Sequence, residues 1–191
     1  MSGAGEAREA ARRAHRLPGD PSPAAAVAAM IRVDHAGEMG AVRIYDGQLA
    51  VLGRSAAAPA IRAMAAQERR HLTAFERLVA ERRVRPTALS PLWHAAGFAL
   101  GAATAMLGER AAMACTVAVE EVIDEHYRRQ AEALGTAEPA LRRTIEEFRG
   151  EELEHRTVAL AHGAEELPGY RLLAGAVKTG SRLAIWLSTR L

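Results

Sequence analysis

Apolar side chains recur every three or four residues along almost the whole chain, which is the spacing that places them on one face of an α-helix. No run of β-branched residues alternates with polar residues in the way that a half-buried strand would. Prolines and glycines separate the periodic segments. We therefore expect an all-α protein with helices over residues 24–52, 58–83, 92–107, 109–134, 138–162 and 170–189.

Each of the four longest predicted helices carries a glutamate within its apolar stripe. These residues are Glu38, Glu68, Glu120 and Glu152. Burying an ionised carboxylate without a partner costs several kcal/mol or forces the group to take up a proton. No lysine or arginine lies on the four stripes to balance this charge. A bound metal is the remaining ordinary source of positive charge, so the pattern predicts a metal site inside the bundle.

Two of these glutamates begin a Glu-x-x-His motif, Glu68 with His71 and Glu152 with His155. Residues three apart on a helix point the same way, so each motif can present an oxygen and an imidazole to one ion. The lone glutamates precede the motifs by 30 and 32 residues, so the arrangement occurs twice. This is the ferritin-like pattern for two iron or manganese ions, and it predicts a four-helix bundle with two added helices. The predicted metal ligands are Glu38, Glu68, His71, Glu120, Glu152 and His155.

Within this set, we expect Glu68 and Glu152 to bridge the two ions and Glu38 and Glu120 to be terminal ligands. We also expect these four carboxylates to be the catalytic residues. Carboxylate and imidazole ligands with open positions suit iron. The predicted cofactor is therefore a pair of iron ions, and ferrous pairs activate dioxygen as a co-substrate.

Several neighbouring residues are alternatives to this ligand set. Glu121 adjoins Glu120, but the apolar stripe of its helix favours Glu120. Glu151 and Glu154 flank Glu152, but only Glu152 keeps the three-residue spacing to His155.

Other polar residues near the motifs fit supporting roles better than metal ligation. The histidines of this kind are His35, His126 and His162, and the acidic residues that could orient metal-bound imidazoles are Asp34 and Asp124. Tyr45 and Tyr127 fit a packed core better than a redox role.

Composition narrows the choice of partners. The chain has 25 basic and 23 acidic residues and a formal charge of +2, so we expect no nucleic-acid partner. Its single cysteine, Cys115, rules out an internal disulfide and fits a reducing compartment. Residues 1–23 have no apolar central region, so we expect a disordered arm there and one domain over residues 24–191.

Two segments are suited to a membrane surface. Residues 86–108 carry no charged side chain, but they are rich in alanine and glycine and fit an interfacial helix better than a membrane span. The C-terminal helix places leucines on one side and basic side chains on another, namely Arg171, Lys178, Arg182 and Arg190. The alternative is that both helices cover the bundle or form a dimer interface.

At these residues the chain resembles the demethoxyubiquinone hydroxylase family of ubiquinone biosynthesis, from about residue 28 onward. The resemblance is carried by segments such as IRVDHAGE at 31–38, AMACTVAVEE at 112–121 and EELEH at 151–155. It implies a membrane-associated di-iron monooxygenase that hydroxylates the benzoquinol ring of a polyprenylated ubiquinone precursor, in the penultimate step of the pathway. The family's six ligands correspond to the same six residues that the spacing selects.

The resemblance also implies a peripheral protein on the cytoplasmic face of the bacterial inner membrane, or on the mitochondrial inner membrane in a eukaryote. A homo-oligomer or an accessory lipid-binding protein is a further possible partner. Two other functions fit the ligand pattern: an iron-oxidising or peroxide-reducing ferritin relative, and a membrane-peripheral scaffold without a metal. Quinol turnover separates the first from the hydroxylase, and metal analysis separates the second.

Overall fold

The computed structural model describes residues 19–191, and in this part of the chain all the regular structure is helical. The elements are α2 (Pro23–Leu52), α3 (Ala58–Glu81), α4 (Ser90–Met106), α5 (Glu109–Leu134), α6 (Pro139–Ala161), the 3-10 helix η1 (Ala164–Glu166) and α7 (Tyr170–Arg190). The all-α prediction and the six predicted helices are confirmed, with bounds that differ by two residues or fewer. Only the short η1 was not expected.

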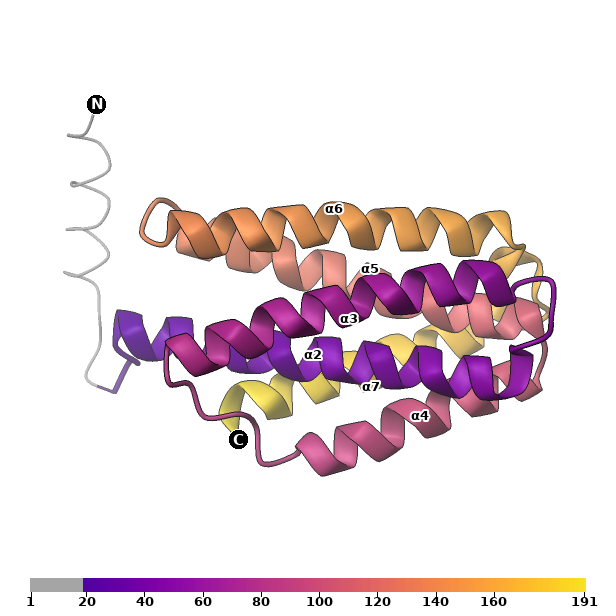
Figure 1. The fold of residues 1–191 in the computed structure, drawn as a ribbon, viewed down its shortest axis with the longest axis horizontal. Helices are drawn as coiled ribbons and strands as arrows, with labels where there is room; N and C mark the ends of the chain where they lie inside the picture. The colour runs from indigo at the N-terminus through magenta and orange to yellow at the C-terminus, as the bar shows by residue number, and fades with distance from the viewer. Residues whose placement is uncertain (1–18) are drawn as a thin grey trace.

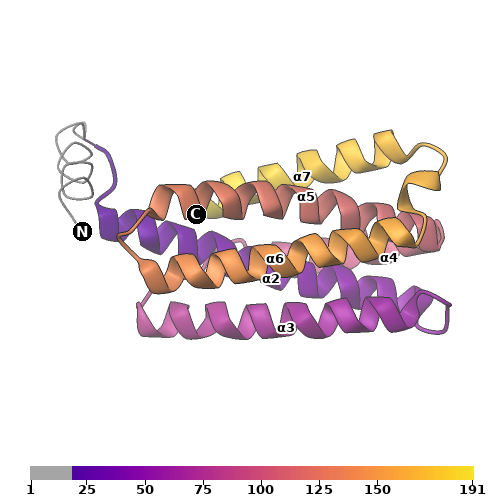
Figure 2. The same ribbon diagram turned by 90° about the horizontal axis from the view of Figure 1, so that it is seen from above.

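Four antiparallel helices form the central bundle. The hairpin of α2 and α3 packs against the hairpin of α5 and α6 (Figures 1 and 2). Buried apolar side chains from all four helices meet between the hairpins. Core residues such as Ile61, Met113 and Ile145 are fully buried. This is the ferritin-like arrangement that the repeated motif predicts.

Local signals in the sequence explain where the helices begin and end. At the start of α2, the Ser22 hydroxyl accepts a hydrogen bond from the Ala25 backbone N–H at 3.1 Å, and Pro23 occupies the first helical position. At the other end of the bundle, Gly163 and Gly169 have φ angles of 77° and 81° on either side of η1. Glycine tolerates this left-handed backbone, which lets the chain turn twice before α7.

The two added helices lie on one side of the bundle. Helix α4 packs mainly along α2, and α7 packs along α5 and α2, while α3 and α6 form the opposite side (Figure 1). The Trp93 indole N–H donates to the Ser188 hydroxyl at 2.9 Å and joins the start of α4 to the end of α7. No helix in residues 19–191 is both long and apolar enough to span a membrane. The sequence predicts a disordered arm over residues 1–23. Residues 1–18 of this arm lie outside the described part of the chain, so the arm stays a prediction there.

Glycines let α4 approach α2 at backbone distance. A side chain at Gly101 would overlap the carbonyl oxygen of Ile44, and one at Gly97 would lie 2.8 Å from the carbonyl oxygen of Gly40. Gly47 meets the backbone of α4 in the same way from α2. Because backbone rather than flexible side chain occupies this space, α4 is seated on α2 with no room for a methyl group.

We therefore expect Gly101→Ala to destabilise the protein by about 1–3 kcal/mol, the usual cost of overpacking a filled interface. The control is Gly180→Ala on α7, where an added methyl group meets nothing within 4 Å. In an exposed helix interior, alanine is better than glycine by up to ~1 kcal/mol, so the control should be neutral or stabilising. Urea unfolding of both variants measures the difference. Equal stability of the two would contradict the close packing of α4 on α2.

Candidate metal centre

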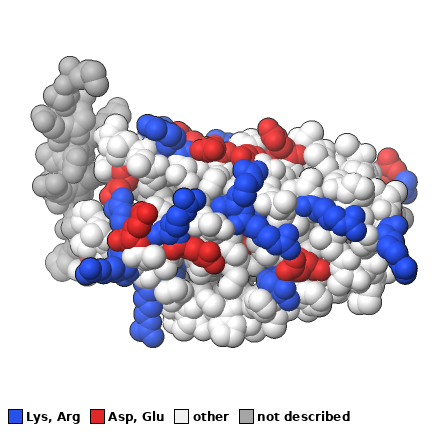
Figure 3. All heavy atoms as spheres, in the orientation of Figure 1, with Lys and Arg blue, Asp and Glu red and all other residues white. Residues whose placement is uncertain are grey.

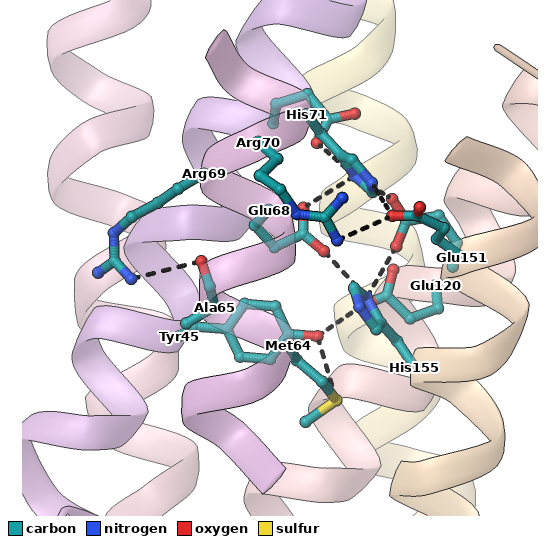
Figure 4. Close-up of polar contacts among 12 residues, drawn as sticks. Tyr45, Met64, Ala65, Glu68, Arg69, Arg70, His71, Glu120, Glu151 and His155 are labelled. Atoms are coloured by element: carbon teal, nitrogen blue, oxygen red, sulfur yellow. Dashed lines mark hydrogen bonds and ion pairs between the residues drawn. The ribbon is translucent and has the colours of Figure 1, made fainter. Parts of the chain in front are cut away.

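The six predicted ligands meet in the middle of the bundle. Glu38 comes from α2, Glu68 and His71 from α3, Glu120 from α5, and Glu152 and His155 from α6. They form two groups of four residues, and each group is suited to one metal ion. Within each group, the ligand atoms all lie within 4.8 Å of one another. One group contains Glu38, Glu68, His71 and Glu152, and the other contains Glu68, Glu120, Glu152 and His155. All six side chains are buried, and Figure 4 shows four of them converging between the hairpins.

Glu68 and Glu152 belong to both groups because each of them spans the two imidazoles. Glu152 Oε1 lies 3.2 Å from His71 Nδ1, and its Oε2 lies 3.0 Å from His155 Nδ1. Glu68 does the same, with Oε2 at 3.9 Å from His71 Nδ1 and Oε1 at 3.0 Å from His155 Nδ1. This is the arrangement expected of carboxylates that bridge two ions.

The two lone glutamates each belong to one group only. Glu38 Oε2 lies 3.5 Å from His71 Nδ1, and Glu120 Oε1 lies 3.9 Å from His155 Nδ1. This is the arrangement expected of terminal ligands, one on each side of the shared pair.

Burial and mutual repulsion raise the pKa of three of the four carboxylates. Burial, and next the charge of Glu152, raise the pKa of Glu68 and of Glu120 well above the usual 4.5. Burial also raises the pKa of Glu38. Burial opposes ionisation of Glu152 too, but the neighbouring imidazoles of His155 and His71 outweigh it and lower its pKa to about 2. Without a metal, protons must therefore neutralise most of this cluster.

The imidazole of His71 carries one of those protons. Burial alone would lower its pKa, but the neighbouring carboxylates of Glu152 and Glu38 outweigh burial and raise the pKa from 6.5 to about 10. A divalent ion would replace such protons with a stronger positive charge in the same place.

The buried polar atoms of the cluster fit a metal better than they fit one another. Glu68 Oε1 and His71 Nδ1 are buried and close to other ligand atoms, yet neither has a hydrogen-bond partner. Buried polar atoms are otherwise almost always satisfied. Unpaired ligand atoms that lie close together are what a shared ion requires, so the residues present fit a pair of metal ions.

Glu151, set aside in the sequence as a neighbour of Glu152, contacts the site from outside. Its Oε2 lies 2.7 Å from His71 Nε2, the ring nitrogen that faces away from the cluster. The Phe148 ring stacks on the same imidazole at 4.0 Å between centroids. A carboxylate on the outer nitrogen fixes the tautomer and orientation of a ligating histidine. Glu151 comes from α6 and His71 from α3, so spacing along one helix could not reveal this contact.

Two buried tyrosines also reach the cluster. The Tyr45 hydroxyl donates to Glu120 Oε1 at 2.8 Å, and the Tyr127 hydroxyl donates to Glu38 Oε1. The sequence correctly places both tyrosines in the core, where they are 2% and 1% exposed. It does not reveal the hydrogen bonds, because each joins residues on different helices.

The remaining candidates lie away from the ligand atoms. Glu121 pairs with Lys178 and Arg156, which agrees with the preference for Glu120. Asp34 bonds to His126 and Gln130, and Asp124 pairs with Arg149, so neither aspartate orients a ligand imidazole as expected. The outer nitrogen of His71 faces α6, where Glu151 provides the carboxylate that neither aspartate provides.

The pKa shifts predict how the metal-free protein responds to pH. Protonated His71 stabilises the fold below pH 6.5, and this contribution is lost as pH rises through its folded pKa of about 10. The raised pKa values of Glu38, Glu68 and Glu120 act in the same direction. The unfolding temperature in the presence of a chelator should therefore fall as pH rises from 6.5 to about 10.

Metal loading should weaken this dependence, because bound metal replaces the protons and binds more tightly as they leave. Scanning calorimetry of metal-free and metal-loaded protein across this pH range measures both trends. A metal-free unfolding temperature that is constant or increases with pH would be inconsistent with the assignment.

Comparison with known proteins agrees with the geometry. Residues 25–188 match the family described as "Ubiquinone biosynthesis protein COQ7". The chain is 61% identical to the 3-demethoxyubiquinol 3-hydroxylase of Rhodospirillum rubrum over 176 residues, which are 92% of this chain and 83% of that protein. It is 53% identical to the human mitochondrial NADPH-dependent 3-demethoxyubiquinone 3-hydroxylase, covering 87% of this chain and 79% of the human protein. With the two carboxylate and histidine groups at its centre, the chain belongs to the COQ7 family of ubiquinone biosynthesis proteins.

Proposed function

We propose that this protein is a di-iron monooxygenase that hydroxylates the benzoquinol ring of a polyprenylated demethoxyubiquinol with dioxygen, the penultimate step of ubiquinone biosynthesis. The observation that carries the proposal is the pair of ligand groups sharing Glu68 and Glu152, in a chain 61% identical to a protein named for this reaction. A ferritin relative would share the ligands, but the relatives found are hydroxylases.

The six clustered residues would hold the two ions, one between Glu38 and His71 and the other between Glu120 and His155, with Glu68 and Glu152 between them. When bound, a ferrous pair supplies two electrons and the open coordination positions that dioxygen activation requires. The protein's part is to hold the ligands and to keep water away from them. The rings of Phe75 and Phe148 and the side chain of Met64 provide that dry surrounding.

Balance of the reaction explains why the site needs reducing equivalents. One oxygen atom enters a ring C–H bond and the other leaves as water, which takes two electrons and two protons beyond those of the ring. Four carboxylates would balance the four positive charges of a ferrous pair, so the loaded site would be about neutral.

A polyprenyl substrate also calls for contact with a lipid surface, and α4 supports this part of the proposal. Its seventeen residues include no Asp, Glu, Lys or Arg. Leu92 and Met106 are 54% and 70% exposed on its outer face. Figure 3 shows charged side chains over much of the visible face, whereas the lower part, along which α4 runs in Figure 1, is largely uncharged.

Helix α7 is less simply amphipathic than its sequence indicates. Lys178 and Arg182, expected on a membrane-facing basic side, pair with Glu121 and Glu125 of α5. These two glutamates lie about one turn apart on α5, so they draw that side of α7 onto the bundle. Leu172 and Leu183 remain exposed, at 81% and 55%.

The proposed location is the surface of the membrane that holds the quinone pool: the cytoplasmic face of a bacterial inner membrane, or the inner membrane of mitochondria. The named relatives include both a bacterial protein and mitochondrial ones. A second copy of the chain or an accessory lipid-binding protein would be further partners.

The hydroxylase proposal predicts product labelled from dioxygen. Protein loaded with about two iron ions per chain, supplied with a reductant, demethoxyubiquinol and ¹⁸O₂, should yield a hydroxylated quinol with one labelled atom. Glu68→Gln should lose iron and turnover yet stay folded, because it removes a buried charge. Glu154→Gln, an exposed neighbour on α6, should keep both.

Mass spectrometry of the quinols and iron analysis of each variant provide the measurements. Oxygen consumption and iron oxidation without a hydroxylated quinol would favour a ferritin-like activity instead. Label that comes from water, under conditions excluding exchange, would exclude the monooxygenase reaction.

The lipid-surface proposal predicts that the outer face of α4 controls vesicle binding. Leu92→Asp combined with Met106→Asp should greatly reduce co-flotation with phospholipid vesicles, because each change removes exposed apolar area and adds a charge. The matched control is Leu153→Asp, at a residue 39% exposed on α6, on the opposite side of the bundle. Equal flotation of the double variant and the control would assign the face of α4 to a protein partner.

A further inference from the structure

The two tyrosines that reach the cluster form a reciprocal pair. Tyr45 on α2 donates to Glu120 on α5, and Tyr127 on α5 donates to Glu38 on α2. Each tyrosine follows the glutamate of its own helix by seven residues. Seven residues are close to two helical turns, so glutamate and tyrosine share one face, and the two helices exchange one hydrogen bond in each direction.

The hydroxyl groups, rather than the rings, make this arrangement specific. Both residues lie in the core, where phenylalanine would supply the same apolar ring. A buried phenol needs an acceptor, and here the acceptor is a carboxylate oxygen. Burial, and next the charges of Glu120 and Glu38 respectively, raise the pKa of Tyr45 and Tyr127 well above 10, so both hydroxyls keep the proton that they donate.

The glutamates that accept these hydrogen bonds are the two with the fewest contacts to the ligand imidazoles. Glu68 and Glu152 each span both imidazoles, whereas Glu38 contacts only the imidazole of His71 and Glu120 only that of His155. A carboxylate beside one imidazole can rotate about its side-chain bonds more freely than one that spans two. A hydrogen bond from the opposite helix removes that freedom.

We propose that Tyr45 and Tyr127 are positioning residues of the metal centre, each fixing the terminal carboxylate that the opposite helix contributes. Tyr127 acts on the ion beside His71, and Tyr45 acts on the ion beside His155. The inference rests on the proposed di-iron function and adds two residues outside the ligand set. Hydrogen-bond partners of metal ligands typically change metal affinity by about 10–100-fold when removed.

The chain provides its own control. Tyr170, the third of its three tyrosines, lies at the start of α7 and packs against apolar groups away from the six ligands. Tyr170→Phe therefore measures the loss of a tyrosine hydroxyl without any contact to a ligand. Glu151→Gln marks one ion, because Glu151 bonds His71 and does not contact His155 in the structure.

The experiment loads the full-length protein with ⁵⁷Fe(II) under anaerobic conditions and measures iron affinity by competition with a chelator. Tyr45→Phe and Tyr127→Phe should each lower the affinity by about 10–100-fold, and Tyr170→Phe should not. Circular dichroism and the unfolding temperature of each metal-free variant show whether the fold is intact. Mössbauer spectra should show Tyr127→Phe and Glu151→Gln changing the same iron signal, and Tyr45→Phe changing the other.

Wild-type affinity in both variants would overturn the inference, as would an equal loss in Tyr170→Phe. Equal changes at both iron signals in each variant would show general loosening of the core and would also overturn it. If the wild-type protein takes up no iron, the proposed function and this inference both fail. If the wild-type protein binds iron and both tyrosine variants bind it with the same affinity, the proposed function stands and the positioning role is rejected.

Discussion

Four carboxylates buried between two helical hairpins, with no lysine or arginine among them, set the conditions for the rest of this structure. Loss of hydration, and next their mutual repulsion, raise the pKa of three of them, and the carboxylates of Glu152 and Glu38 raise the pKa of His71. Such a core is costly unless positive charge enters it. Stability has therefore been given up at the centre of the bundle for a site that can hold two cations.

The internal repeat explains why much of the site could be predicted from the sequence. Glu-x-x-His on one helix requires only the helical period, and the matching lone glutamate follows from the apolar stripe. The distinction between Glu120 and Glu121 was also readable, because one lies on the stripe and the other pairs with Lys178 on α7. The helix bounds were predictable because prolines and glycines mark them.

The contacts that the sequence did not reveal all cross between helices. The hydrogen bond between Glu151 and His71 depends on how α6 is rotated against α3. Glu151 therefore orients the ligand imidazole, a role considered for Asp34, which bonds to His126 instead. The bonds from Tyr45 and Tyr127 depend on the separation of α2 and α5. Periodicity determines which side of a helix faces inward, but not which residues on two helices meet. The pairing of Lys178 and Arg182 with α5 was missed for the same reason.

The sharing of Glu68 and Glu152 has a consequence for how the protein is assembled. Each ligand group takes three residues from one hairpin and one from the other, so neither hairpin contains a complete site. Bound ions would thus act as cross-links between the two hairpins. The only covalent link between these halves of the chain is α4 with its connections. Metal uptake and docking of the hairpins then become a single cooperative event. A newly made chain would complete its centre only after α6 has been synthesised and has packed against α3.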